Sequence, residues 1–340
     1  MKVSELGEFG LIGLLAEMIS SAQDKSAAAY RKLLIGIGDD AAAWKGDTAT
    51  QLVTTDSLFQ DIHFRLETTP WYELGWKSLA VNLSDIAAMG GVPEYAVISL
   101  ALPLDTEVGD VKALYQGMLD LAGRFGVALI GGDTCRAPLV SITITVLGSA
   151  GDKDGKVLTR SAARAGEKIA VTGALGAAAA GMEILDKRLK LDAASAGQLR
   201  TAFLKPEPRV AEGQRLVELG VKAAIDISDG LISDLKHVCE SSRVGARVEA
   251  DRIPVASAVR AHFGGRALEL AAAGGEDYEL LFTASEDVIG RVKSELSCPI
   301  TIIGDIVAEE PGSIVMVDEH GEPVHLGKSG WEHFNAGNGV

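Results

Sequence analysis

Aspartates recur in short clusters flanked by small residues, and this is the most informative chemical pattern in the sequence. Most of the clusters directly follow an apolar run, where a strand would end. Asp is unfavourable inside strands but is a natural ligand of hard cations. The pattern predicts a site that gathers several Mg²⁺ ions around phosphate groups. The five clusters are Gly38-Asp39-Asp40, Thr54-Thr55-Asp56, Asn82-Leu83-Ser84-Asp85, Gly131-Gly132-Asp133 and Asp226-Ile227-Ser228-Asp229-Gly230.

Taken singly, each cluster also has an ordinary structural interpretation. An Asp that follows a strand can cap a helix, and Asp85 lies on the polar face of an otherwise apolar helix, as a solvated residue would. The 131–133 cluster is more specific, because glycines let a backbone come close to a ligand. In the 226–230 cluster the acids lie three residues apart at a strand-to-helix turn, where a helix N-terminus favours phosphate.

The other chemistry-bearing residues fit the same interpretation. Acids without a His/Cys metal pattern favour Mg²⁺ over zinc. Arg160 offers a guanidinium suited to bidentate phosphate binding. His63 either packs beside Phe64 or contacts a phosphate. No Ser-His-Asp or Cys-His order indicates nucleophilic catalysis.

Charge and composition limit the class of protein. The net charge of −15 argues against a nucleic acid partner, since phosphate backbones require Lys and Arg. The three cysteines are far apart and odd in number, which argues against a disulfide framework and favours a reducing cytoplasm. Glu5 and Glu8 interrupt the apolar N-terminus, so no signal peptide is expected. No apolar run is long enough for a transmembrane helix, and no membrane association is expected.

Apolar periodicity predicts the elements that position the acids in the first half of the chain. We expect the segment 141–147 to be a sheet strand or a dimer strand, because it alternates strictly between Ile142, Ile144 and Val146 and smaller polar residues. The diglycine at 90–91 is expected to end a strongly amphipathic helix. Helices are predicted at 4–20, 76–89 and 107–125, and strands at 33–37, 52–54, 96–102, 127–130 and 141–147.

A chain of 340 residues is too long for one typical core, so two domains are expected, 1–150 and 151–340, with a boundary at the turn 151–155. Strands and helices in both halves predict α/β or α+β layers, and their irregular order argues against a doubly wound sheet. In the second half we predict a polar loop around 190–200. Helices are predicted at 174–189, 208–219 and 230–242, and strands at 168–172, 222–227, 246–250, 278–283 and 299–303.

In order and spacing, the motifs resemble those of the thiamine-monophosphate kinase family over nearly the full chain. This family shares a superfamily with aminoimidazole ribonucleotide synthetase. The matching motifs are Glu5-Leu-Gly-Glu-Phe-Gly, Gly38-Asp-Asp-Ala, Thr54-Thr-Asp, His63-Phe64, Gly75-Trp-Lys-Ser, Asn82-Leu-Ser-Asp, Gly131-Gly-Asp-Thr, Leu158-Thr-Arg-Ser, Asp226-Ile-Ser-Asp-Gly, Gly274-Gly-Glu-Asp-Tyr-Glu and Gly330-Trp-Glu-His-Phe.

The resemblance implies ATP-dependent phosphorylation of thiamine monophosphate to thiamine diphosphate by direct in-line transfer, assisted by several Mg²⁺ ions. It implies no general base, because the acceptor phosphate is already ionised. Mg²⁺ positions are implied at Asp40, Thr54, Thr55, Asp56, Asp85, Asp133, Asp226 and Asp229, with Asp39 beside them. ATP contacts are implied at Tyr115, Gly132, Asp133, Arg160 and Ser228, and thiamine phosphate contacts at His63, Glu276 and Trp331.

The same resemblance implies a two-domain fold of the aminoimidazole ribonucleotide synthetase type. Its N-terminal domain, 1–150, would bind Mg²⁺ and ATP and pair its sheet across a homodimer. Its C-terminal α+β domain, 151–340, would complete the nucleotide and substrate site. Two alternatives stay open: a related ATP-using enzyme with another small acceptor, and a non-catalytic protein that binds divalent cations or nucleotides.

Overall fold

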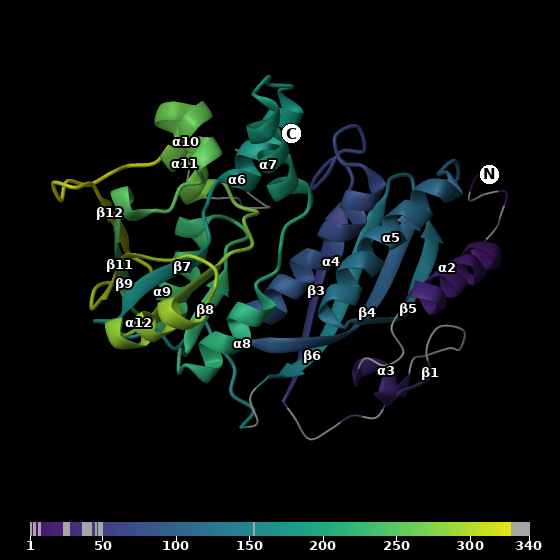
Figure 1. Ribbon diagram of the computed structural model, residues 1–340, viewed down its shortest axis with the longest axis horizontal. Coiled ribbons are helices and arrows are strands. Elements are labelled where there is room, and N and C mark those ends of the chain that lie inside the picture. Colours follow the sequence, from purple (N-terminus) through teal and green to yellow (C-terminus); the bar gives the residue numbers. More distant parts are fainter. Residues whose placement is uncertain are drawn as a thin grey trace. The chain divides into compact units, whose positions relative to one another are not determined.

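The computed structural model describes residues 2, 5, 8–22, 28–35, 43, 44, 46, 50–151 and 154–327. Residue contacts divide the chain into two compact units, shown in Figure 1. The N-terminal unit comprises Met1–Ile86 and Val92–Ala150, and the C-terminal unit comprises Ala87–Gly91 and Gly151–Val340. Each unit contains its own sheet and helices, which confirms the predicted α/β or α+β layers.

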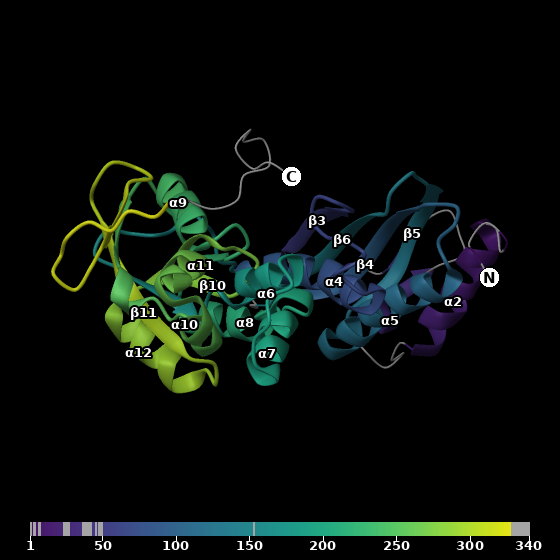
Figure 2. The same cartoon turned by 90° about the horizontal axis from the view of Figure 1, so that it is seen from above.

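The N-terminal unit is built on a four-stranded sheet with the order β3-β6-β4-β5. Figure 2 shows α4 and α5 along one face of this sheet. The strands are β3 (Gln51–Phe59), β4 (Gly91–Leu102), β5 (Ala128–Arg136) and β6 (Ser141–Ala150), with a separate short pair β1 (Leu33–Ile35) and β2 (Ala43–Trp44). The helices are α2 (Glu8–Ala22), α3 (Ala28–Lys32), α4 (Trp71–Ala88) and α5 (Val108–Phe125).

The predicted alternation along 141–147 is confirmed in β6. Ile142, Ile144 and Val146 are each at most 1% exposed and pack in the core with the apolar stripes of α4 and α5. Because β6 lies between β3 and β4, it is an interior sheet strand. Its antiparallel pairing with β3 sets Asp56 opposite Ile144.

The C-terminal unit carries a six-stranded sheet with the order β12-β9-β11-β7-β10-β8. All its strand pairs are antiparallel except β12 with β9. The strands are β7 (Lys168–Thr172), β8 (Ala223–Asp226), β9 (Gly245–Glu249), β10 (Leu280–Ala284), β11 (Ile300–Val307) and β12 (Ile314–Val317). The helices are α6 (Ala177–Asp186), α7 (Ala193–Leu204), α8 (Val210–Glu218), α9 (Leu231–Ser242), α10 (Ser257–Phe263), α11 (Ala267–Ala273) and α12 (Glu286–Glu295).

The predicted loop around 190–200 is wrong, because the helix α7 begins at Ala193. Its sequence is rich in small residues and shows little apolar periodicity. The helix is stabilised instead by Asp192, which accepts a hydrogen bond from the Ser195 N–H at 2.9 Å, and by close packing on α6. A Cβ at Gly181 would lie 2.1 Å from the Leu199 carbonyl oxygen, so only glycine permits this approach. The short elements α10, α11, α12 and β12 were also not predicted.

Gly131 and Gly132, which were expected to follow a strand, lie inside the strand β5. Gly132 belongs to β5, where it is paired in parallel with Ile98 of β4 next to a register shift. A Cβ on Gly132 would lie 1.9 Å from the Ile98 carbonyl oxygen, whereas a Cβ on Gly131 would meet no atom within 4 Å. The glycine at 132 is therefore required by the close approach of the two strands.

We expect Gly132→Ala to lower the free energy of unfolding by about 1–3 kcal/mol, because the strands must separate to admit the methyl group. Urea denaturation followed by circular dichroism measures this change. Gly131→Ala is the matched control, and its midpoint should stay near that of the unmodified chain. Equal midpoints for both variants would contradict the packing argument.

Candidate active site

In the N-terminal unit, the structure brings Thr54, Asp56 and Asp85 together. Alternation along β3 puts Thr54 and Asp56 on the same face, and Asp85 comes from α4. The Thr54 hydroxyl donates to the Asp85 carboxylate at 2.5 Å. Burial, followed by the charge of Asp85 and a hydrogen bond with it, raises the pKa of Asp56 from 3.8 to about 6. Two carboxylates this close favour a bound cation.

A buried acceptor lies one turn before Asp85 on α4. Asn82 is fully buried, and its amide N–H donates to the Ser78 carbonyl at 3.1 Å. Its Oδ1 atom has no hydrogen-bond partner among the described residues. A buried oxygen without a donor costs free energy, and a cation or an ordered water relieves that cost. This atom adds oxygen ligand capacity on the helix that carries Asp85.

Thr55 does not join this group with its side chain. Its hydroxyl donates to the Ile144 carbonyl at 3.2 Å and accepts from the Thr145 hydroxyl at 3.0 Å. Both partners belong to the neighbouring strand β6, and Thr55 is exposed on the face of β3 opposite to Thr54.

Asp133 lies on β5, at the other edge of the sheet, where it is exposed. The strands β6 and β4 separate Asp133 from Asp56. Within one chain, the predicted metal-binding acids of this sheet therefore form two separate groups. Tyr115, a predicted nucleotide contact, is 5% exposed in the apolar core, and burial raises the pKa of its hydroxyl.

His63 follows β3 in a tight turn and is half-buried. Its Nδ1 accepts the Phe59 N–H at 3.0 Å, and the two rings lie 5.9 Å apart. Because Nδ1 is an acceptor, the proton of the neutral ring is on Nε2. The turn therefore fixes the ring as a donor through Nε2, which is the form that suits a phosphate oxygen.

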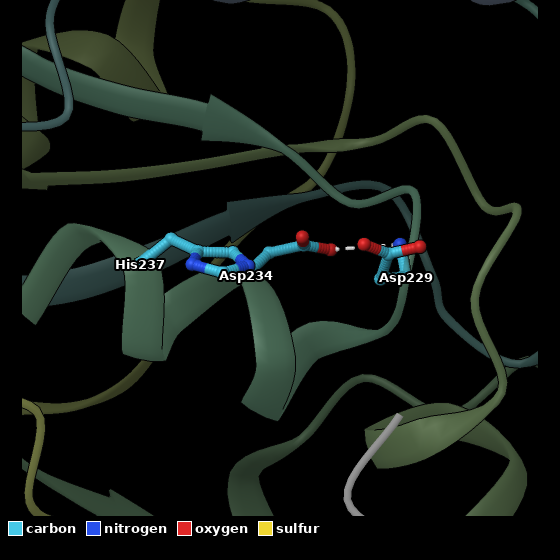
Figure 3. A group of neighbouring side chains, drawn as sticks. All are labelled: Asp229, Asp234 and His237. Carbon is cyan, nitrogen blue, oxygen red and sulfur yellow. Dashed lines mark hydrogen bonds between the residues drawn. The ribbon is translucent and has the colours of Figure 1, made fainter. Parts of the chain in front are cut away.

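In the C-terminal unit, Asp226, Ser228 and Asp229 lie at the turn from β8 to α9. Asp234 organises this turn, as Figure 3 shows in part. Its Oδ2 accepts three consecutive backbone N–H groups, from Ser228, Asp229 and Gly230, at 3.0, 3.1 and 3.1 Å. Burial raises the pKa of Asp234 to about 8, with smaller contributions from Asp226 and Asp229. The amides that were expected to favour a phosphate are thus bonded to a carboxylate of the chain itself.

Asp234 and His237 were missed by the sequence analysis. Ligand atoms of Asp229, Asp234 and His237 all lie within 4.8 Å of one another, a spacing that can hold a metal ion. The sequence does contain one signal. Asp234 falls between Leu231 and Val238 on the buried face of α9, where an acid is unexpected without a partner.

Glu276 lies in a strained loop before β10. Its φ of 60° is left-handed, and its N–H donates to the Ser228 carbonyl at 2.7 Å. The structure therefore brings the predicted substrate residue Glu276 and the predicted nucleotide residue Ser228 together in this unit. Gly275 makes the approach possible, since a Cβ there would lie 2.6 Å from the same carbonyl oxygen.

Arg160 is exposed, and its carbonyl accepts the Ser242 hydroxyl at 2.8 Å. This bond ties the backbone of Arg160 to the end of α9. Asp39, Asp40 and Trp331 lie outside the described residues. None of the described helices combines the length and the apolar character that crossing a bilayer requires.

Comparison with known proteins gives consistent matches over both units. Residues 38–150 match the model of the AIR synthase related protein N-terminal domain, and residues 164–317 match that of the C-terminal domain. The chain is 39% identical to the thiamine-monophosphate kinase of Escherichia coli (strain K12) over 334 residues, which cover 96% of this chain and 98% of that protein. It is 37% identical to the thiamine-monophosphate kinase of Bacillus subtilis (strain 168), with 88% and 93% covered.

Comparison with solved structures agrees with these sequence matches. The thiamine-monophosphate kinase of Stenotrophomonas maltophilia K279a superimposes with a TM-score of 0.80 at 37% identity, covering 91% of this chain and 96% of that chain. A structure described as AaThiL complexed with AMPPCP and TMP gives a TM-score of 0.76 at 29% identity, covering 98% and 99%. The hydrogenase maturation protein HypE in complex with ATP, at 19% identity and a TM-score of 0.77, shares the fold.

The raised pKa of Asp234 predicts how stability depends on pH in the absence of metal. Its folded pKa of about 8 exceeds its ordinary value of 3.8, so between these values unfolding releases a proton. The free energy of unfolding should therefore fall as pH rises from about 4 to about 8, by up to about 1.4 kcal/mol per pH unit. Asp234→Asn removes this ionisation and keeps one acceptor oxygen.

Urea denaturation of both proteins in EDTA at several pH values measures the difference. We expect Asp234→Asn to gain stability relative to the unmodified chain as pH rises, and the gain to level off above pH 8. Parallel stability profiles would show that Asp234 ionises normally in the folded protein.

Proposed function

This chain belongs to the thiamine-monophosphate kinases of the AIR synthase related family, and we propose that it transfers the γ-phosphoryl group of ATP to thiamine monophosphate. The products are thiamine diphosphate and ADP, and the reaction is the last step of thiamine diphosphate biosynthesis. The observation that carries the proposal is the match over nearly the whole chain to relatives named for this activity. The related structure with AMPPCP and TMP supports ATP as the co-substrate.

Several Mg²⁺ ions complete the proposal, because both substrates are polyanions that repel each other. Bound Mg²⁺ would neutralise phosphate oxygens and favour in-line transfer. In the N-terminal unit the cation ligands would be Thr54, Asp56 and Asp85, whose close carboxylates and nearby unpartnered Asn82 oxygen fit a hard cation. We assign further ligands to Asp133, Asp226 and Asp229, and, from the motif matches, to Asp40 and the backbone of Thr55.

The residues of the chain divide between the two substrates. Tyr115, Gly132, Arg160 and Ser228 are assigned to the nucleotide, and the exposed guanidinium of Arg160 can pair with a phosphate in bidentate geometry. His63, Glu276 and Trp331 are assigned to thiamine monophosphate.

His63 donates from Nε2, because its Nδ1 is held by the Phe59 N–H. The acceptor phosphate is ionised at neutral pH, so no residue is assigned as a general base. The chemistry then depends on positioning and charge neutralisation alone.

We also propose that the N-terminal unit forms a homodimer through its sheet and that the enzyme acts in the cytoplasm, where ATP is available. The edge strand β3 supports the homodimer. Val53 is 70% exposed and Phe59 is 44% exposed on this strand, and apolar edge strands favour pairing with another chain.

The test of function is a reaction with ATP, Mg²⁺ and thiamine monophosphate, with products separated by chromatography. Thiamine diphosphate and ADP should form in equal amounts. Asp56→Asn should lower kcat/KM by about 10²–10³-fold, because it removes a charge that acts on the transition state. Its half-saturating Mg²⁺ concentration should rise as well.

Asp120→Asn is the matched control, since Asp120 is an exposed acid of the same unit that bonds to Tyr72 and Gln116. Its kinetics should stay close to those of the unmodified enzyme. No product above a no-enzyme control at excess Mg²⁺ would exclude the kinase. ATP binding with indifference to thiamine monophosphate would favour another acceptor.

The dimer predicts a sedimenting species of twice the chain mass. Val53→Asp should shift this species toward the monomer, because it buries a charge between paired strands. Val315→Asp, on the edge strand β12 of the C-terminal unit and 42% exposed, is the control and should leave the sedimentation coefficient unchanged. Monomeric unmodified protein at micromolar concentration would overturn the dimer.

A further inference from the structure

The loop that carries Glu276 has an unusual backbone. Glu276 and Tyr278 have φ values of 60° and 51°, and the preceding Gly275 has 69°. A left-handed conformation is unfavourable for residues with a side chain, so two of them within three positions need support from their surroundings. The loop would otherwise relax, and the direction of the Glu276 side chain would change with it.

Backbone hydrogen bonds fix one side of this loop. The Tyr278 N–H donates to the Ile227 carbonyl at 2.9 Å, and the Ile227 N–H donates to the Glu279 carbonyl at 2.8 Å. With the bond from Glu276 to Ser228, they align the loop along the turn after β8. These bonds set where the loop lies, but they do not neutralise its charge.

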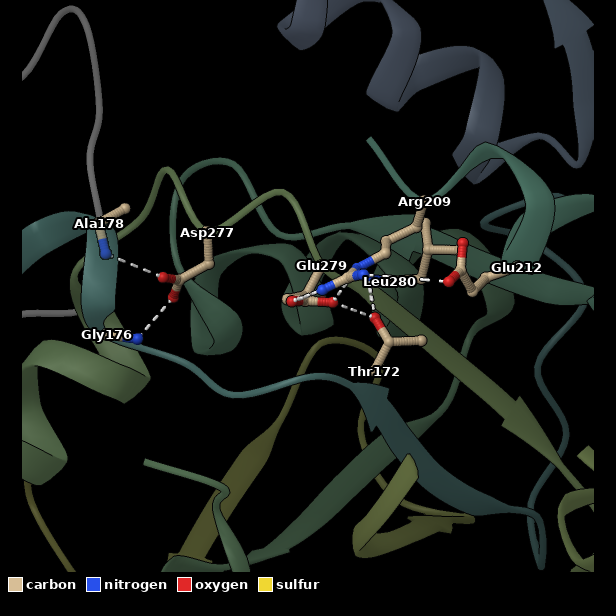
Figure 4. A network of polar contacts seen from close by, with 8 residues as sticks. All are labelled: Thr172, Gly176, Ala178, Arg209, Glu212, Asp277, Glu279 and Leu280. Carbon is tan, nitrogen blue, oxygen red and sulfur yellow. Dashed lines mark hydrogen bonds and ion pairs between the residues drawn. The ribbon is translucent and has the colours of Figure 1, made fainter. Parts of the chain in front are cut away.

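The loop contains three acids within four residues, Glu276, Asp277 and Glu279. Asp277 is bonded to the N-terminus of α6, where it accepts the N–H groups of Gly176 at 2.8 Å and Ala178 at 3.3 Å (Figure 4). Helix N-terminal amides stabilise a carboxylate, so these two bonds oppose the burial that raises the pKa of Asp277 to about 7.

Glu279 is compensated by Arg209. Glu279 is 6% exposed, and its carboxylate accepts Arg209 Nε at 2.7 Å, Arg209 Nη2 at 2.5 Å and the Thr172 hydroxyl at 2.6 Å (Figure 4). It also packs tightly on the backbone, since a Cβ at Gly173 would lie 2.0 Å from its Oε1. The bidentate fork therefore fixes both the position and the orientation of Glu279.

Arg209 is itself held on a short, stiff segment. It directly precedes α8, with Pro208 before it and Pro206 two residues earlier. Each proline has a fixed φ and restricts the residue before it, so the segment that leads to Arg209 is stiff. The buried charge of Glu279 makes Arg209 necessary, because an uncompensated buried carboxylate would repel Asp277 and Glu276.

From these contacts we infer that Arg209 and Glu279 are positioning residues for thiamine monophosphate, acting through Glu276. The ion pair, with the helix bond of Asp277, maintains the left-handed loop and so fixes the Glu276 carboxylate. Arg209 itself does not touch the substrate. The inference rests on the proposed kinase function and on Glu276 as its substrate contact.

The test is a double-mutant cycle between Arg209→Lys and Glu276→Gln in the thiamine monophosphate kinase assay. Lysine keeps the charge but loses the bidentate fork. We expect Arg209→Lys to raise KM for thiamine monophosphate about tenfold and KM for ATP by less than about twofold. In the Glu276→Gln background, Arg209→Lys should change KM for thiamine monophosphate little further, because its effect passes through Glu276.

A merely structural role gives a different result. It would lower the melting temperature and the active fraction, but KM does not depend on the active fraction. Arg266→Lys is the matched control, because Arg266 makes a bidentate pair in the same unit but pairs with Glu183 instead of an acid of the loop. This variant should keep both KM values.

Glu279→Gln is measured in parallel and keeps the assay decisive if Arg209→Lys does not fold. It preserves the shape and one acceptor oxygen, and it should raise the same KM. The inference is overturned if both variants leave KM for thiamine monophosphate within about twofold, or if the two substitutions in the cycle act independently. The unmodified enzyme is assayed first. If it forms thiamine diphosphate, unchanged KM values in the variants contradict this inference alone. If it forms none, the proposed kinase function fails and the inference fails with it.

Discussion

The burial of carboxylates beside one another is the constraint on which the rest of this structure depends. Asp56 and Asp85 lie close enough, in a sufficiently buried place, for the pKa of Asp56 to rise to about 6. Burial, with smaller contributions from Asp226 and Asp229, raises the pKa of Asp234 further, to about 8. A chain without cations would be more stable with these acids apart. The fold holds them together, and a cationic occupant would offset the cost.

Packing and hydrogen bonding of rigid helices and strands stabilise the positions of the acids. Asp85 is carried by α4, whose apolar stripe is fully buried against the sheet, and Asp56 is held by the continuous β3–β6 ladder. Glycines remove the remaining steric obstacles. Gly132 lets β5 approach β4, and Gly275 lets the Glu276 loop approach Ser228. Packing of the two cores therefore stabilises arrangements that the charges alone would oppose.

The sequence predicted the repetitive parts of this architecture and missed the parts that depend on tertiary contacts. Strict alternation of apolar and polar residues identified β6, because a strand that is buried on one face has apolar residues at every second position. The helix α7 was missed, because its stability comes from Asp192 and from contact with α6 rather than from periodicity. No local pattern indicates the left-handed backbone of Glu276 and Tyr278, which neighbouring hydrogen bonds impose.

For the candidate site too, some features could be predicted from the sequence and others depend on tertiary contacts. Residue types indicated acids that could bind Mg²⁺, and the resemblance assigned individual residues to Mg²⁺ and to the two substrates; these assignments stay predictions. The structure shows the contact between Thr54 and Asp85, which motif order could not specify. It also shows that the side chain of Thr55 is directed away from that pair. Sequence identifies the chemical groups, whereas contacts decide which of them act together.

The start of α9 shows what this distinction implies for recognition. A strand, a small-residue turn and a helix indicate an amide site for phosphate, and the 226–230 turn has that form. Asp234 already accepts the three amides that such a phosphate would need. A phosphate bound there would have to displace a buried carboxylate. At this turn, anionic substrate groups would therefore be better recognised through cations held by the acids than through the backbone, which agrees with the proposed use of Mg²⁺ in place of a phosphate-binding loop.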